Sequence, residues 1–385
     1  MKKVGLVTCF LDNYGACLQA LALQQQINSL GCQCDIIAYV GNHGYAHDNF
    51  FSALKMEIKN YAYTVWNNWH LDGKVGPYTR KLAFYGFRKR FLEFNTYTNT
   101  KITKYYDKID ELYTLQNKYD VFVCGSDQIW NPTFYGKNHP VHFLRFAGDK
   151  KRVAYAPSIG LYEMPTEYQQ TFIEYINDFD CVSVRERAGS NIIKDLCARE
   201  AKVVLDPTLL IGSEFWENLI NTDYQKPFEK YIFCYIFSNT SQCSEYLESV
   251  QAKTQLPIVY VNVSKLKYDN VRSYCAEDKS PIEFLQLIKN AEFVVTDSFH
   301  GTAFSLLLNK EFYVFKREID YEKIDMFSRI DSILEITNLK NRIVELDSDF
   351  TVKEKINYSD VNLLLAEFRE DSNNYLKESI LGENE

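Results

Sequence analysis

Apolar runs alternate with helical patterns along most of this 385-residue chain. An apolar run at residues 3–9 leads into a polar glycine turn, a helical pattern at 16–30 and a second β-rich run at 35–40. Strand, turn, helix and strand in this order form the unit of a parallel α/β sheet. Further runs rich in β-branched and aromatic residues continue the rhythm and predict strands at residues 119–124, 152–156, 180–184 and 202–205.

A second series of the same kind follows, with predicted strands at residues 231–237, 258–263, 293–296 and 312–315. Asp206-Pro207-Thr208 punctuates the chain between the two series, and residues 213–219 predict a linking helix. We therefore expect two α/β domains, at residues 1–210 and 211–345. A last helical pattern within residues 355–385 is expected to pack back on the first domain.

Residues 42–118 interrupt the first domain as an insertion rich in aromatic and basic side chains. Within it, residues 79–94 predict a helix with one aromatic and one cationic face. Such a helix either packs on the sheet with a solvated basic side or contacts a lipid-linked or polyanionic acceptor at a membrane surface.

The net charge of −8 is concentrated near the C-terminus. Residues 318–385 contain 17 acidic and 8 basic side chains, whereas residues 1–317 contain 34 acidic and 35 basic ones. The chain lacks the basic excess of a nucleic-acid-binding protein. Its nearly neutral body is compatible with a small anionic substrate.

Ten cysteines are scattered through the chain, several of them in apolar runs, as is typical of free thiols in a reducing compartment. No C-x-x-C pair occurs, and we expect no metal site. The N-terminal apolar run is too short for a signal peptide, and no stretch of about 20 apolar residues follows. These features predict a cytoplasmic protein, with peripheral contact at the inner face of the membrane through residues 79–94 as the further option.

The clearest candidate for chemistry is the turn Thr296-Asp297-Ser298-Phe299-His300-Gly301-Thr302. A buried strand ends and a helix begins here, so His300 is expected at a helix N-terminus, where N–H groups and the dipole favour an anion. Open α/β sheets bind ligands at this edge. A lone histidine is usually structural, but an imidazole in this position is a candidate acid/base.

Two other turns carry groups suited to substrate binding. Period-two alternation along residues 180–187 places Ser183, Arg185 and Arg187 on one face, and arginine suits bidentate binding of phosphate or carboxylate. The alternative is an exposed strand end with Arg–Glu pairs. After the predicted strand at 119–124, Asp127 either orients or deprotonates a sugar hydroxyl or caps the following helix.

The glycine turn at residues 12–16 is a weaker signal, because such turns are common in α/β folds. It lacks the full G-x-G-x-x-G pattern, so we do not expect NAD.

Five motifs together resemble the polysaccharide pyruvyl transferase family. They occur in the order and at the spacing of that family over about residues 1–320: Asn13-Tyr14-Gly15-Ala16, Gly125-Ser126-Asp127-Gln128-Ile129-Trp130-Asn131-Pro132, Ser183-Val184-Arg185-Glu186, Leu205-Asp206-Pro207-Thr208 and Thr296-Asp297-Ser298-Phe299-His300-Gly301-Thr302-Ala303. The resemblance implies a GT-B-like α/β fold, in which two Rossmann-like domains face each other across a cleft.

The resemblance also implies the reaction. A pyruvyl group passes from phosphoenolpyruvate, a co-substrate needing no further cofactor, to two hydroxyls of one sugar and leaves a cyclic pyruvate ketal. The acceptor is expected to be a capsule, exopolysaccharide or other surface glycan, or a lipid-linked oligosaccharide precursor.

By this resemblance His300 is the expected catalytic acid/base, and Arg185 holds the anionic groups of the donor. From its own position in the turn, Asp127 is expected to be a second catalytic group. The other expected donor-binding residues are Arg187, Ser298, Gly301, Thr302 and Lys316. Those expected to line the cleft or bind the acceptor are Asn13, Tyr14, Gly15, Ser126 and Asp297.

The histidine motif departs from one pattern of the family. Some members carry arginine two residues before the histidine, where this chain has Ser298. Lys316 or Arg317, just after the next predicted strand, is expected to supply the cation instead. Two alternatives stay open: a nucleotide-sugar-dependent glycosyltransferase of the same fold, and a catalytically inactive glycan-binding relative.

Overall fold

The computed structural model describes most of the chain outside the expected insertion. Residues 42–89 and 91–92, which include most of the predicted amphipathic helix at 79–94, lie outside the described residues. No helix among the described residues is long and apolar enough to cross a membrane. The described ranges are residues 1–10, 13–39, 90, 93–135, 139–220, 224–238, 240–262, 272–276, 279–317 and 325–382.

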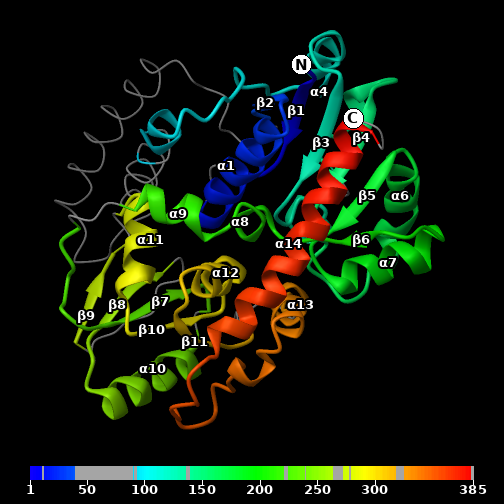
Figure 1. The fold of residues 1–385 in the computed structure, drawn as a ribbon. Coiled ribbons are helices and arrows are strands. Elements are labelled where there is room, and N and C mark those ends of the chain that lie inside the picture. Colours follow the sequence, from blue (N-terminus) through cyan, green and yellow to red (C-terminus); the bar gives the residue numbers. More distant parts are fainter. Residues whose placement is uncertain are drawn as a thin grey trace, which may run out of the picture.

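The first sheet has six parallel strands in the order β2-β1-β3-β4-β5-β6 (Figure 1). Strand β1 pairs with both β2 and β3, so the strand order reverses direction at β1 and β3. All of β3 is buried, which agrees with its apolar sequence Val-Phe-Val-Cys-Gly. The bounds are β1 Lys3–Val7, β2 Gln33–Ile36, β3 Val121–Gly125, β4 Lys151–Tyr155, β5 Cys181–Val184 and β6 Lys202–Val203.

The second sheet has five parallel strands in the order β11-β10-β7-β8-β9, and its order reverses at β7 and β10. The bounds are β7 Ile232–Ile236, β8 Ile258–Asn262, β9 Ser273–Cys275, β10 Phe293–Thr296 and β11 Glu311–Val314. The expected α/β fold with two Rossmann-like units is therefore confirmed.

Helices flank both sheets, and several begin at residues suited to capping. Asn13 caps α1 by accepting the N–H of Ala16, and Ser280 forms a capping box with Glu283 at the start of α11. The helices are α1 Tyr14–Ser29, α4 Ile109–Leu112, α5 Pro132–Tyr135, α6 Thr166–Ile176, α7 Arg187–Cys197, α8 Pro207–Leu210, α9 Ser213–Leu219, α10 Ser241–Thr254, α11 Pro281–Asn290, α12 Phe299–Leu307, α13 Ser328–Ile336 and α14 Tyr358–Leu381.

Helix α1 joins the two units through a shared core. It packs on β2 of the first sheet and also contacts α11 beside the second. Leu18 and Leu21 belong to the same hydrophobic cluster as Phe284 and Phe304 of the second unit. Most of α1 is buried, as expected of a helix covered on nearly all sides.

The C-terminal helix α14 runs along both units (Figure 1). Val361 and Leu365 near its start join the cluster of the second unit, whereas Leu376 and Ile380 near its end join a cluster of the first. The Tyr375 hydroxyl donates to the carbonyl of Ala154 in β4 at 3.1 Å.

Candidate active site

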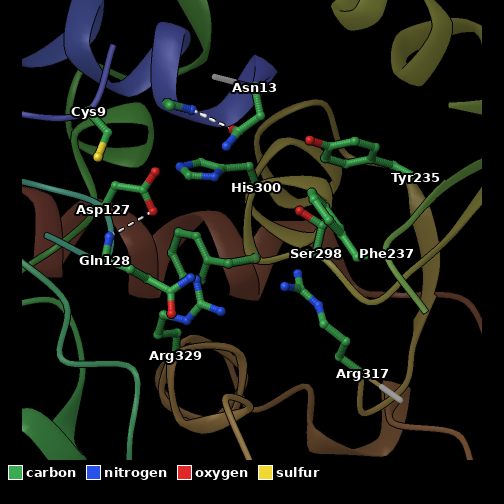
Figure 2. Close-up of a pocket in the computed structure, with 12 residues that line it drawn as sticks. Cys9, Asn13, Asp127, Gln128, Tyr235, Phe237, Ser298, His300, Arg317 and Arg329 are labelled. Carbon is green, nitrogen blue, oxygen red and sulfur yellow. Dashed lines mark hydrogen bonds between the residues drawn. The ribbon is translucent and has the colours of Figure 1, made fainter. Parts of the chain in front are cut away.

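A cavity of about 250 Å³ opens where the strand orders of both sheets reverse (Figure 2). Its walls follow the carboxyl ends of β1 and β3 in the first sheet and of β7, β10 and β11 in the second. Open α/β sheets bind ligands at this edge and at such reversal points. The described residues that line it are Cys9, Asn13, Ala16, Asp127, Gln128, Tyr235, Phe237, Ser298, Phe299, His300, Arg317 and Arg329.

His300 lies in the first turn of α12, as the sequence predicts. Ser298 caps this helix by accepting the N–H of Gly301. On one side of the imidazole, Gly15 leaves no room for a side chain, because a Cβ there would lie 2.0 Å from His300 Nδ1. On the other side, Nε2 lies 3.8 Å from Asp206 Oδ2, which is an ion-pair distance rather than a hydrogen bond. The imidazole is thus oriented by residues of the first unit.

Asp206 is fully enclosed and connects His300 with Arg185. Its Oδ2 accepts hydrogen bonds from Arg185 Nη1 at 2.6 Å and Ser126 Oγ at 2.9 Å, and its Oδ1 accepts from the Thr208 hydroxyl at 2.7 Å. Burial acts to raise the pKa of Asp206, but His300 and Arg185 outweigh it and hold this pKa below its usual range. The carboxylate is therefore ionised and faces the imidazole.

Two guanidinium groups of the second unit line the cavity, and Figure 2 shows them on the opposite side of His300 from Asn13. Arg317 follows β11 and stacks on Phe237 at 4.2 Å, and its Nε lies 3.9 Å from Asp297 Oδ2. Arg329 belongs to α13 and is 5% exposed. Its side chain donates to the carbonyl of Met326 at 3.4 Å. Burial first, and then the charges of Arg185 and Arg317, lower the pKa of Arg329 to about 9, so it stays cationic at neutral pH.

Asp127, Gln128 and Asn13 form the first unit's side of the cavity. Asp127 has a left-handed backbone with φ of 61°, and its Oδ1 accepts the N–H of Gln128 at 2.9 Å. This carboxylate lies 3.7 Å from Arg185 Nη2. It is the only carboxylate among the described residues of the cavity wall.

Arg185 and Arg187 of the first unit do not lie on one face of a strand, as the period-two alternation predicts. Strand β5 ends at Val184 and α7 begins at Arg187, so the period of two does not continue. Arg185 points inward to Asp206, under the Phe299 ring at 4.1 Å, and does not line the cavity. Arg187 is exposed and pairs with Glu335 at 3.5 Å.

Of the two cations that the sequence offers after β11, Arg317 lines the cavity and Lys316 does not. Its ammonium pairs with Asp325 at 3.4 Å on the surface, whereas its neighbour Arg317 lines the cavity. The two side chains follow β11 in succession and point to different sides.

Several other expected site residues shape the site without lining the cavity. Gly301 packs on Thr296, and the Thr302 hydroxyl donates to the Ser298 carbonyl at 3.0 Å. The Tyr14 hydroxyl donates to the Lys279 carbonyl at 2.7 Å. Asp297 accepts the N–H of Ser238 at 2.7 Å and so joins the ends of β7 and β10.

Sequence reasoning assigned no role to Asp206, Arg329 or Tyr235. Tyr235 lines the cavity, and its buried hydroxyl makes no hydrogen bond to the described residues. Arg329 lies 29 residues after His300, in a helix without a recognisable motif. One signal in the sequence was available: Ile333 and Ile336 lie four and seven residues after Arg329. This helical spacing places Arg329 on the apolar face of its helix. Within the described ranges, no three His, Cys, Asp or Glu side chains gather as a metal site would require.

The fold resembles that of nucleotide-sugar enzymes at low sequence identity. S. aureus MnaA in a structure with UDP gives a TM-score of 0.52 at 12% identity, over 98% of this chain and 91% of that chain. UDP-GlcNAc 2-epimerase from Neisseria meningitidis, bound to UDP-GlcNAc, gives 0.50 at 8% identity, over 99% and 96%. At such identities the likeness establishes the GT-B-like fold alone.

No curated protein sequence matches the chain. A family model for polysaccharide pyruvyl transferase matches residues 13–318, a range that contains Asn13, Asp127, Asp206 and His300. The matched range therefore supplies both sides of the cavity and implies a transferase that acts on polysaccharide. On this match the chain belongs to the polysaccharide pyruvyl transferase family.

Proposed function

We propose that this protein transfers a pyruvyl group from phosphoenolpyruvate to two hydroxyls of one sugar in a surface polysaccharide or its lipid-linked precursor. Phosphoenolpyruvate is the co-substrate, and no other cofactor takes part. The observation that carries the proposal is the placement of His300, a buried imidazole facing Asp206 at 3.8 Å in the cavity between the two units of a member of this family.

The chemistry of the reaction defines what the site must do. One sugar hydroxyl adds to C2 of the donor while a proton is delivered to C3. The C2–O bond to phosphate then breaks, the second hydroxyl attacks C2, and its proton leaves with the released phosphate. Two C–O bonds form and one breaks, and the product is a cyclic ketal with no change in net oxidation state.

His300 and Asp127 are suited to the two proton transfers. An imidazole can act as acid or base near neutral pH, so His300 delivers the proton to C3. Asp127 faces the cavity from the first unit and accepts a hydroxyl proton. Asp206 is a positioning residue that stabilises the protonated imidazole.

The direct test combines the protein with phosphoenolpyruvate and a panel of sugar acceptors, and measures phosphate release and pyruvylated product. His300→Ala and His300→Asn should lower the rate by about 10²–10⁴-fold. Arg187→Gln is the control, because Arg187 lies outside the cavity. No phosphate release from any acceptor would count against the proposal, and a His300 variant within threefold of wild type would remove this residue from the mechanism.

The second candidate function is transfer from a nucleotide sugar, which the UDP-bound neighbours of this fold favour. It predicts thermal stabilisation by a UDP-, GDP- or CMP-sugar. Pyruvyl transfer predicts stabilisation by phosphoenolpyruvate instead. A thermal shift experiment with these ligands side by side separates the two enzyme classes.

A further inference from the structure

We infer that Arg317, Arg329 and Tyr235 form the binding site for a small anion that carries a phosphate and a carboxylate, and that Arg185 does not touch this ligand. The inference takes the identity of the anion from the proposed function. The site itself is assigned from the geometry of the cavity.

Besides His300, three residues of the second unit that line this cavity each carry a buried hydrogen-bond donor. Arg329 Nε, Arg317 Nε and the Tyr235 hydroxyl are buried and make no hydrogen bond to the described residues. Buried polar groups are normally satisfied, and each exception calls for a partner that the protein alone does not supply. Guanidinium groups donate hydrogen bonds and accept none, so a ligand that meets them here is an acceptor, and an anionic acceptor gives the strongest hydrogen bonds.

The charge around these donors points the same way. Arg329 is 5% exposed, and its charged surroundings are the cations Arg185 and Arg317 and the carboxylates Asp127 and Glu186. Arg317 has Asp297 near its Nε at 3.9 Å, but that carboxylate already accepts two backbone N–H groups and the Ser238 hydroxyl. The cations have the larger effect on the pKa of Arg329, and an anion bound between Arg317 and Arg329 relieves the repulsion between these two guanidinium groups.

Arg185 differs because it is paired with Asp206 and lies outside the cavity wall, although its Nε and Nη2 also make no hydrogen bond to the described residues. Its Nη1 donates to Asp206 at 2.6 Å, and Phe299, which lines the cavity, stacks on its guanidinium at 4.1 Å. Binding an anion here would require breaking a buried ion pair, which is costly. We therefore assign Arg185 to positioning Asp206 and, through it, His300.

The dimensions of the cavity favour a small ligand. Its volume of about 250 Å³ lies below the roughly 300–1,000 Å³ of sites for drug-sized ligands. A phosphorylated three-carbon acid fits this range better than a complete nucleotide sugar. Ser298, which caps the first turn of α12, lines the cavity from the same unit.

The test is calorimetric titration of the full chain with phosphoenolpyruvate, inorganic phosphate and UDP-GlcNAc. Arg317→Gln and Arg329→Gln should each weaken phosphoenolpyruvate binding by about ten- to hundredfold, and Tyr235→Phe by a smaller factor. Arg329→Lys keeps the charge and should recover part of the affinity. Arg187→Gln, an exposed arginine paired with Glu335, is the matched control and should bind as wild type does.

Stability measurements separate a ligand site from a structural role. An unpaired buried cation destabilises the free protein, so Arg329→Gln should melt at the wild-type temperature or above it. A clear fall in its midpoint, with phosphoenolpyruvate binding by Arg317→Gln unchanged, would overturn the inference.

The other outcomes are equally decisive. Phosphoenolpyruvate binding within threefold of wild type in both arginine variants would overturn the site, even if pyruvyl transfer is observed. Binding of UDP-GlcNAc but not of phosphoenolpyruvate would overturn the assigned ligand. Arginine-dependent binding of phosphoenolpyruvate without transfer to any sugar would support the site and refute the proposed function.

Discussion

The imidazole of His300 is placed by two residues that carry no obvious catalytic chemistry of their own. Gly15 in α1 touches its Nδ1 side, and Asp206 faces its Nε2 side. Both belong to motifs of the first unit, whereas the histidine belongs to the second. The glycine is explained by close approach, since its φ is not in the left-handed region.

Substitution of Gly15 tests this contact. In Gly15→Ala the added methyl group would lie 2.0 Å from Nδ1, so the imidazole must move. A displacement of about 1 Å can lower a rate by about 10²-fold, and we expect at least that loss in kcat for transfer. Gly189→Ala in α7 is the control, because its Cβ would meet Glu186 Oε1 at 3.3 Å, far less severely. Wild-type kcat in Gly15→Ala would show that the contact does not hold the imidazole.

The burial and ion pair of Asp206 predict how the free energy of unfolding depends on this residue and on pH. Asp206→Asn leaves Arg185 without its closest counter-charge, which should cost about 3–5 kcal/mol at pH 7. Because the pKa of Asp206 is lowered in the folded state, the unfolded chain binds the proton first. The contribution of Asp206 is therefore complete above about pH 4 and declines as the pH falls further. Urea denaturation should show a large difference between wild type and variant at pH 7 and a smaller one below pH 4. An equal difference at both pH values would contradict an ionised Asp206.

Residue-level prediction from the sequence succeeded where a local motif fixed the backbone. The turn at residues 296–302 placed His300 and Ser298 at the cavity, because a strand, a cap and a helix start leave little freedom there. The sequence did not decide between Lys316 and Arg317, because the direction of each side chain determines which cation enters the cavity. It also passed over Arg329, because its place depends on how α13 packs against the first unit.

At the scale of elements, the β and α patterns located most strands to within one or two residues. The exceptions are β2, predicted at residues 35–40 but found at Gln33–Ile36, and β9, whose three residues Ser-Tyr-Cys form a short edge strand with no apolar run to mark it. Strand β5 ends at Val184 as predicted, but the alternation does not continue beyond it, and Arg187 lies at the start of α7 on the surface. Residue propensity and periodicity thus predict that a strand exists better than they predict its last residue. The last residue depends on where the neighbouring strands stop pairing with it.

The burial of α14 predicts how strongly it is attached. Leu376 is fully buried against the first unit, and Leu376→Ala should destabilise the fold by about 2–5 kcal/mol. Leu363 in the same helix is 62% exposed, and Leu363→Ala should change stability by less than about 0.5 kcal/mol. Urea unfolding of the two variants measures the contrast. Equal losses would indicate that helix propensity, rather than packing on the sheet, holds α14.

At the scale of the whole molecule, the site exists only because two reversal points face each other. Neither sheet alone brings His300 within reach of Asp206, since these residues come from different units. The sequence predicts two sheets and their ligand-binding edges, but the hydrophobic contacts of α1 and α14 fix how the edges meet. Such contacts join residues hundreds of positions apart and leave no local pattern.

Tyr14 offers the sharpest test of this dependence. Its ring projects from α1 into the second unit, stacks on Phe284 with centroids 4.4 Å apart, and its hydroxyl donates to the Lys279 carbonyl. Tyr14→Ala removes a fully buried ring and should cost about 3–5 kcal/mol. It should also lower kcat at least about tenfold, because His300 is no longer fixed relative to Asp206.

The control variant Tyr14→Phe keeps the ring stack and loses one neutral hydrogen bond, about 1 kcal/mol, so its kcat should stay near that of wild type. Unfolding and kinetics measured well below the melting temperature distinguish the two effects. If Tyr14→Ala lost stability but kept wild-type kcat, the packing between the units would stabilise the protein without setting the geometry of the site.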